Sequence, residues 1–235
     1  MTNDFHRKAI NEMSKAMMSL EINWTTNTAG YLFGKIVDAV ALFGENQDGL
    51  TILINPAQQA YFRKQLADSL SYVEAYVRTG YLGSVCGANI LVSNVVPEKA
   101  CFILQGNKAV TLFLKKGTEL ETFRQPNTRT NEVYIRKVGL VALTDNTKIA
   151  MLAPSQTTAI SITTAASSTT TVAGTCASDA FKVAVVDDAG KTYYTTPSSG
   201  SWSVSVASAL AVGDDLTARA YAPAKAVSVD TYTVS

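Results

Sequence analysis

The sequence predicts two architectures in one chain, an α+β segment over residues 1–153 and an all-β segment over residues 154–235. Apolar residues at helical spacing occur only before Ala153, whereas apolar and polar residues alternate in short runs after Pro154. The composition changes at the same point, because 27 of the 81 residues from Ser155 onward are Ser or Thr. Each segment is long enough to bury a core of its own.

Charge and hydrophobicity exclude several classes of protein. Four basic and six acidic residues give the second segment a charge of −2, so the first carries +3 of the total of +1. This balance does not favour a protein that binds nucleic acid through surplus Lys and Arg. With 47% hydrophobic residues the chain is globular, and its sequence contains neither a long apolar run nor a signal-peptide pattern.

The residues that commonly carry chemistry do not form a recognisable set. Cys86, Cys101 and Cys176 lack Cys-x-x-Cys spacing, so neither a zinc site nor a disulfide framework is predicted. His6 is the only histidine and falls on the polar side of a predicted helix, so a Ser-His-Asp set is excluded. Phosphate-binding glycine motifs do not occur. We therefore expect no enzyme and no cofactor.

The first segment begins with predicted helices. A helix over 5–20 is indicated by apolar residues three or four positions apart, namely Phe5, Ala9, Met13, Ala16, Met17 and Leu20. A second helix over 31–43 ends at Gly44, and the apolar run 51–55 is typical of a buried strand. Pro56 suits the first turn of a third helix. Residues 70–84 fit either a helix or a flexible excursion.

Strands predominate in the rest of this segment. The predicted strands cover 88–93, 100–105, 119–124, 132–143 and 148–152, and residues 108–114 form a short helical or strand-like piece. The polar loop 125–131 separates the two longer strands. Arg124, Arg129 and Arg136 surround this loop, where they fit either contacts with another subunit or ordinary solvated charges.

Several signatures carry a resemblance. The run VDAVALFGENQDGLTILINPAQQAYFRK places a helix before a strand that leads into a proline-capped helix. Gly83 to Pro97 follow the pattern G-x-x-x-G-x-x-(apolar)₃-S-x-x-V-P, and the long strands close with ALTDNTKI. Over about residues 5–152 this order resembles the major capsid proteins of tailed bacteriophages with the Hong Kong 97-like fold.

The resemblance implies an A-domain-like region over 30–105 and peripheral-domain strands over 118–152. It implies that the loop 125–131 points towards neighbours at three-fold positions, with Arg124, Asn127, Arg129, Asn131 and Arg136 as subunit contacts. The expected assembly is a homo-oligomer of pentamers and hexamers that encloses double-stranded DNA without binding it specifically. It would form in the host cytoplasm and end in the virion.

One departure from the family concerns the N-terminus. Members usually have an arm, an extended hairpin and most of a spine helix before this region, whereas Met1 falls inside the expected helix. The resemblance therefore implies a truncated or split subunit, with a separate chain supplying the arm and hairpin and covering Met13, Met17 and Leu20. Some such capsids join Lys and Asn covalently. Asn127 and Asn131 lie in the matching loop, but the hairpin that would donate the lysine is outside this sequence.

The second segment predicts a β-sandwich. Seven short strands are expected over 159–163, 169–173, 181–186, 192–196, 202–206, 216–220 and 228–234, with turn residues between them. The run GKTYYTTPSSGSWSVSVASALAVGDDLTARAYAP resembles bacterial immunoglobulin-like domains. That resemblance implies a core around Trp202, Tyr193 and Val204. The acidic residues Asp187, Asp188, Asp214 and Asp215 are read as solvated turns or as a calcium site.

The leading hypothesis is a structural subunit of a bacteriophage head, in which residues 1–152 build the shell and residues 156–235 project outward for surface display or host adhesion. An alternative is a head decoration or adhesin whose second segment binds host-surface glycans through Tyr193, Tyr194 and Tyr221. A further alternative is the shell of an encapsulin-like nanocompartment. No membrane partner is expected.

Overall fold

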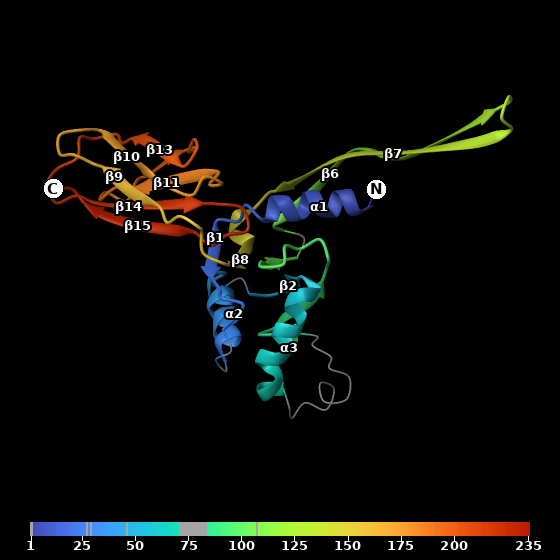
Figure 1. Cartoon of the computed structure of the whole chain (residues 1–235), viewed down its shortest axis with the longest axis horizontal. Helices are drawn as coiled ribbons and strands as arrows, with labels where there is room; N and C mark the ends of the chain where they lie inside the picture. Colours follow the sequence, from blue (N-terminus) through green and yellow to red (C-terminus); the bar gives the residue numbers. More distant parts are fainter. Residues whose placement is uncertain (1, 27, 29, 46, 71–83, 107) are drawn as a thin grey trace.

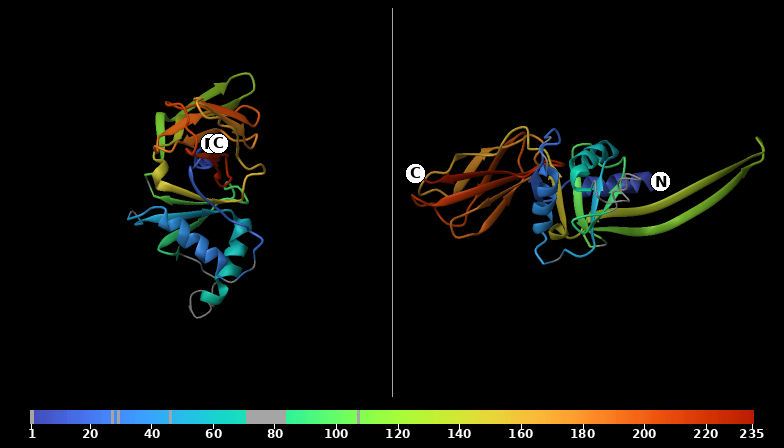
Figure 2. Two further views of the ribbon diagram at one scale, coloured as in Figure 1. Left: turned by 90° about the vertical axis from the view of Figure 1, so that its left-hand side faces the viewer. Right: turned by 90° about the horizontal axis from the view of Figure 1, so that it is seen from below.

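The computed structural model describes residues 2–26, 28, 30–45, 47–70, 84–106 and 108–235. Most of the ambiguous region 70–84 therefore lies outside the described residues. A central body carries a long two-stranded hairpin on one side and a pair of sheets on the other, and two helices extend from its lower side (Figure 1). The view from below shows the hairpin and the paired sheets pointing in opposite directions (Figure 2).

A six-stranded mixed sheet forms the body, in the order β1-β8-β5-β2-β4-β3. Its members are β1 (Met18–Glu21), β2 (Leu50–Ile54), β3 (Ser84–Val85), β4 (Ala88–Val92), β5 (Cys101–Gln105) and β8 (Ile149–Ala153). Alternate residues of β8 enter two cores, Leu152 the core beside the lower helices and Met151 the core beside the first helix. A strand that is buried on both faces has a continuous run of apolar residues, and β8 accordingly has the sequence IAMLA.

Three helices pack against this sheet, namely α1 (Thr2–Met13), α2 (Tyr31–Ala41) and α3 (Pro56–Leu70). The predictions for the second and third are confirmed. After α2 the chain turns at Gly44, whose φ of 58° suits a residue without a side chain. Leu32 and Ile36 of α2 and Phe62 of α3 are fully buried, so these two helices close the lower core.

The predicted helix over 5–20 is wrong beyond Met13. Residues 18–21 instead form β1, which runs parallel to β8 with Met18 opposite Ala150. The Ser14 hydroxyl donates to the Ile10 carbonyl at 2.8 Å where the helix ends. Pairing with a fully buried strand outweighs helical periodicity here. Met13 is buried and Leu20 packs against the lower core. Both residues are therefore covered by other parts of this chain, whereas the sequence predicted that a separate chain would cover them.

The long hairpin consists of β6 (Val110–Gln125) and β7 (Thr130–Leu143). The sequence predicted two separate pieces over 108–114 and 119–124, but they belong to one strand of 16 residues. The register of β6 against β7 shifts between Leu114 and Lys116 and again between Lys116 and Glu119. At both shifts β6 carries the extra residue, so β6 is bulged while β7 is regular.

The two sheets opposite the hairpin, called the sandwich below, contain all seven strands predicted after Pro154. One sheet has the order β13-β10-β9 and the other β12-β11-β14-β15. Their bounds are β9 (Ser161–Thr164), β10 (Thr171–Thr175), β11 (Lys182–Val186), β12 (Thr192–Thr195), β13 (Ser201–Ser205), β14 (Asp215–Tyr221) and β15 (Ser228–Thr233). Inward-facing residues of both sheets, including Val172, Val183 and Trp202, share one core.

The sandwich is hydrogen-bonded to the body. In the loop between β14 and β15, the Ala224 amide donates to the Ser14 carbonyl at 2.9 Å and the Val227 amide to the Ser19 hydroxyl at 2.7 Å. The Gln156 side chain donates to the carbonyls of Ala220 and Ala226 at 2.7 and 3.0 Å. The sandwich is therefore connected to the body by residues 154–158 and, in addition, by hydrogen bonds from the loop between β14 and β15.

Candidate assembly surface

The outer half of the hairpin presents two chemically different faces. Opposite residues of an antiparallel pair share a face, and successive residues alternate between faces. Leu120 lies opposite Ile135 and Thr122 opposite Val133, so one face is apolar. The other face carries the polar pairs Glu119 with Arg136 and Glu121 with Tyr134, followed by Phe123 with Glu132.

The apolar face is open to solvent. Leu120 is 63% exposed, Val133 56% and Ile135 52%. Scattered exposed apolar residues are ordinary on a protein surface, but these three adjoin one another on one face of a two-stranded sheet. A lone hairpin in water is marginally stable, and burying this face would stabilise it. An exposed apolar face of this kind is a candidate contact surface.

The polar face is organised around Glu132. Its carboxylate accepts hydrogen bonds from the Gln125 side chain, at 2.9 Å, and from the Tyr134 hydroxyl. That hydrogen bond raises the pKa of the Tyr134 hydroxyl above its ordinary value. A hollow of about 290 Å³ lies on this part of the hairpin and is lined by Glu119, Glu121, Tyr134, Ile135 and Arg136.

The tip residues named from the sequence lie together at the end of the hairpin. Arg124 is paired with Asn131 across the two strands, and Asn127 lies in the turn between the strands. Arg129 occupies the same turn with a φ of 53°. All four are exposed, and the Thr128 hydroxyl bonds to Gln125 and Thr130 to close the turn.

Arg136 lies apart from the tip residues, opposite Glu119 and farther down the hairpin. The apolar face is not among the contact residues predicted from the sequence, which are all charged or amide side chains. The sequence nevertheless contains the spacing that indicates such a face. Leu120 and Thr122 are two positions apart on one strand, and Val133 and Ile135 are two positions apart on the next.

Helix α1 packs against one face of the inner half of the hairpin, although Phe113, Leu114 and Leu140 there are at least half exposed. The Phe5 ring lies against Gly139, where an added Cβ would be 3.2 Å from the ring, and the Lys137 ammonium lies 5.5 Å from the centroid of the same ring. Residues 133, 135, 137 and 139 alternate onto one face of β7. The apolar face is therefore the outward continuation of the face on which α1 packs.

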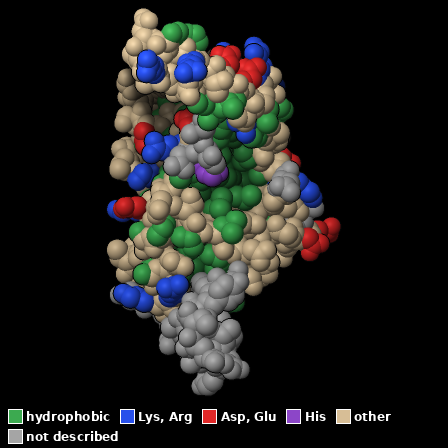
Figure 3. Space-filling model, turned by 90° about the vertical axis from the view of Figure 1, so that its right-hand side faces the viewer, with side chains coloured by type: hydrophobic (Ala, Val, Ile, Leu, Met, Phe, Trp, Pro, Cys, Tyr) green, Lys and Arg blue, Asp and Glu red, His purple; other side chains and the backbone are tan. Residues whose placement is uncertain are grey.

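Exposed apolar side chains also occur on the body, at Leu91 and Val92 of β4 and on α2. On α2, Phe33 and Val37 are one helical turn apart and 45% and 43% exposed. Figure 3, which views the molecule from the hairpin side, shows hydrophobic side chains gathered in a band near the middle of this face, with His6 in purple beside it. His6 is exposed on α1.

The residues expected in the sandwich core differ in their burial. Trp202 is 4% exposed and donates its indole N–H to the Thr175 carbonyl at 3.2 Å. Tyr193 and Val204 are half-buried and pack against the same core. The Tyr193 hydroxyl also donates to the Asp187 carboxylate at 2.9 Å and accepts from the Ala207 amide at 3.1 Å.

The tyrosines considered for glycan binding do not form an open platform. The Lys182 ammonium lies 3.8 Å from the centroid of the Tyr194 ring and occupies one of its faces. Tyr221 is 8% exposed, and the hydroxyl of Tyr193 is engaged as described above. This geometry does not favour stacking of a sugar on these rings.

The acidic turns of the sandwich are used within the chain. Asp187 accepts from the Lys191 amide at 2.8 Å, Asp214 from the Ala211 amide at 2.8 Å and Asp215 from the Thr233 hydroxyl at 2.7 Å. Among the described residues, no group of three or more His, Cys, Asp or Glu side chains could hold a metal ion. The structure favours the turn interpretation over the calcium interpretation.

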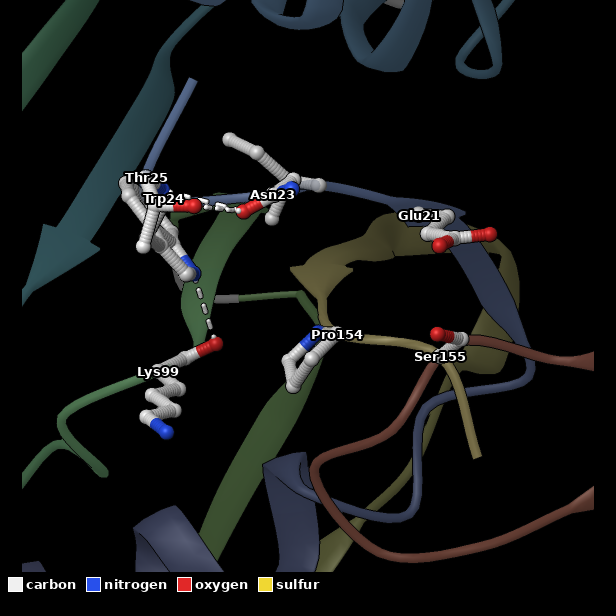
Figure 4. A pocket seen from close by; sticks show the side chains of 8 residues that line it. Glu21, Asn23, Trp24, Thr25, Lys99, Pro154 and Ser155 are labelled. Atoms are coloured by element: carbon white, nitrogen blue, oxygen red, sulfur yellow. Dashed lines mark hydrogen bonds between the residues drawn. The ribbon is translucent and has the colours of Figure 1, made fainter. Parts of the chain in front are cut away.

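A cavity of about 250 Å³ lies where the chain leaves β8 for the sandwich (Figure 4). Trp24 donates its indole N–H to the Lys99 carbonyl at 2.8 Å on one side, and Pro154 and Ser155 form part of the other lining. The ionisable lining residues are Glu21 and Lys99, and neither Cys nor His lines the cavity. No described helix is both long and apolar enough to cross a membrane.

Comparisons with known proteins bear on the fold alone. No protein-family model and no curated protein sequence matches the chain. A solved structure described as Mycobacterium phage Che8 has a TM-score of 0.53 and 16% identity over 64% of this chain. The mature capsid of bacteriophage PhiM1 has a TM-score of 0.50 and 10% identity over 63%. The match spans 57% and 59% of those two chains. The chain is an α+β protein that contains a capsid fold.

Proposed function

We propose that the protein is a structural subunit of a bacteriophage head and that the hairpin β6–β7 forms contacts between subunits. The observation that carries this proposal is the exposed apolar face of Leu120, Val133 and Ile135 at the far end of a capsid fold. A shell gains stability from many repeated interfaces of modest size, so each subunit must offer surfaces of this kind. The role is assembly rather than catalysis.

We assign residues 1–153 to a Hong Kong 97-like shell domain and residues 154–235 to an immunoglobulin-like domain that faces outward. The order of elements over 5–152 supports the first assignment, and the two-sheet core around Trp202 supports the second. The hydrogen bonds from Ala224 and Val227 to the body would hold the second domain at a fixed angle. Surface display suits that rigidity.

We also propose that segments outside this sequence, on this or another polypeptide, contribute to the subunit. The basis is the uncovered apolar face beyond the end of α1, which continues the surface that α1 itself covers. The packaged DNA would be enclosed without specific contacts, as expected for a chain whose net charge is +1. The proposed location is the virion.

Electron microscopy of the purified chain tests the proposal, alone and after coexpression with the product of the reading frame immediately upstream. The expected result is ring-shaped capsomers or closed shells in at least one of the two preparations. Sedimentation velocity on the same samples would report the assembled fraction. Monomers under both conditions would contradict the proposal.

A further inference from the structure

The free edge of β7 is regular over its outer half. The pairing between β6 and β7 advances one residue at a time from Leu120 opposite Ile135 to Gln125 opposite Thr130. Its inner register shifts place extra residues on β6, around Lys115 and Gly117, so the edge of β6 is interrupted by bulges. Bulges oppose strand addition, whereas a long regular edge accepts another strand. The regular edge of β6 is therefore confined to residues 119–125, whereas the edge of β7 is regular along the whole strand and is the longer one available to a second strand.

The sequence of this edge is complementary to itself. If two copies of β7 run antiparallel about a two-fold axis through Tyr134, Glu132 of each copy lies opposite Arg136 of the other. Val133 then lies opposite Ile135, and Tyr134 lies opposite its own copy. Opposite charges and apolar residues in directly opposed positions stabilise an antiparallel pair. Each favourable pair occurs twice because the axis repeats it.

Neighbouring registers lack this match. An axis through Val133 would place Glu132 opposite Tyr134, and an axis through Glu132 would place two carboxylates opposite each other. An axis through Ile135 would set Val133 against Lys137. Registers centred between residues would pair side chains from different faces of the sheet, which the alternation of a strand forbids.

We propose that β7 pairs with β7 of a second copy of this chain, antiparallel and centred on Tyr134. The product is a four-stranded sheet in the order β6-β7-β7-β6. Because a two-fold axis perpendicular to the sheet preserves its faces, the apolar face of one hairpin continues into that of the other. Across the four strands, Leu120 and Ile135 of one copy are then followed by Val133 and Thr122 of the second copy, all on the same face of the sheet. The pairing rests on the proposed function only in that it would join neighbouring subunits of a shell.

Cysteine cross-linking of the full chain tests the register. The background carries Cys86→Ser, because Cys86 is partly exposed while Cys101 and Cys176 are buried. Tyr134→Cys should give a covalent homodimer with a short bis-maleimide, since the axis passes through this position. Thr130→Cys is the matched control: it is also exposed, but the two copies would be about 27 Å apart at this position, so no dimer is expected.

Charge reversal tests the complementarity in the Tyr134→Cys background. Glu132→Arg and Arg136→Glu should each lower the cross-linked fraction about fivefold, and the double substitution should restore it. Dimers from Thr130→Cys equal to those from Tyr134→Cys, or adducts with a different chain, would overturn the pairing. Shells that form without the Tyr134→Cys dimer would overturn it and leave the proposed function standing. The dimer without any capsomers or shells would support the pairing and count against the shell function.

Discussion

The hairpin β6–β7 and the sandwich use the same alternation of apolar and polar residues, but they place their apolar side chains in opposite environments. In the sandwich, Val183 and Val185 are fully buried because a second sheet covers them. In the hairpin, Leu120 and Ile135 are more than half exposed. The difference shows that alternation determines which side chains share a face, whereas the cover for that face must come from another sheet, a helix or another chain.

Truncation of a large aromatic residue should have the largest effect on stability, in the sandwich but not in the hairpin. Trp202→Ala removes a buried ring and should lower the free energy of unfolding by about 3–5 kcal/mol. Phe123→Ala is the matched change in the hairpin, where the ring is 57% exposed, and should cost less than about 1 kcal/mol. Urea denaturation followed by circular dichroism measures both. Equal losses would show that the hairpin ring is buried in the isolated protein.

Glycine substitutions extend the comparison to the backbone. A Cβ at Gly174 would overlap the Ser161 carbonyl oxygen and the Trp202 ring, so Gly174→Ala should destabilise by about 3 kcal/mol. Gly117 lies in the bulged part of β6 with open space around it, and Gly117→Ala should change stability by less than about 1 kcal/mol. Thermal unfolding of the two variants compares them directly. A tolerated Gly174→Ala would mean that β9 and the Trp202 ring, which belong to the same sheet as Gly174, can shift away from β10.

A smaller, pH-dependent effect is expected where the hairpin rejoins the body. Asp145 accepts hydrogen bonds from the Thr147 hydroxyl and amide at 2.7 and 2.9 Å, and these lower the pKa of its carboxyl group. A lowered folded-state pKa stabilises the protein above the ordinary value of 3.8, and this contribution is lost as the pH falls through the folded-state pKa. Asp145→Ala should therefore be less stable than the natural protein at neutral pH.

The difference between Asp145→Ala and the natural protein should disappear in strong acid. Denaturation at several pH values checks this, with the exposed Asp188→Ala as a control for the loss of one carboxylate. A stability difference that stays constant across the acid range would contradict the assigned role of Asp145.

Much of the fold was predictable because its signals are local. Strand TILIN, the proline-capped helix and the seven alternating strands after Pro154 all follow from spacing and turn residues. The end of α1 was not predictable, because residues 18–21 keep helical spacing and become a strand only through pairing with β8, which lies about 130 residues later. Local pattern carries no information about a partner so distant in sequence.

The position of the candidate contact residues was predicted in part, whereas their role as subunit contacts stays a prediction. The charged and amide residues of the tip, such as Arg124 and Asn131, lie where the sequence placed them. The apolar face of Leu120, Val133 and Ile135 was missed, although both strands were expected. Recognising it required the register between β6 and β7, which aligns Leu120 with Ile135, and knowledge that no element of the described chain covers them.

The central claim is that the exposed apolar face of the hairpin mediates assembly, and one comparison tests it most directly. Leu120→Lys with Ile135→Glu places opposite charges on this face while keeping a favourable cross-strand pair. Its control swaps an existing ion pair outside the hairpin, Glu12 and Lys15, 2.8 Å apart, into Glu12→Lys with Lys15→Glu. Both proteins should unfold within about 1 kcal/mol of the natural chain. By electron microscopy the control should assemble into capsomers or shells and the first variant should remain monomeric; assembly of both to the same extent would contradict the claim.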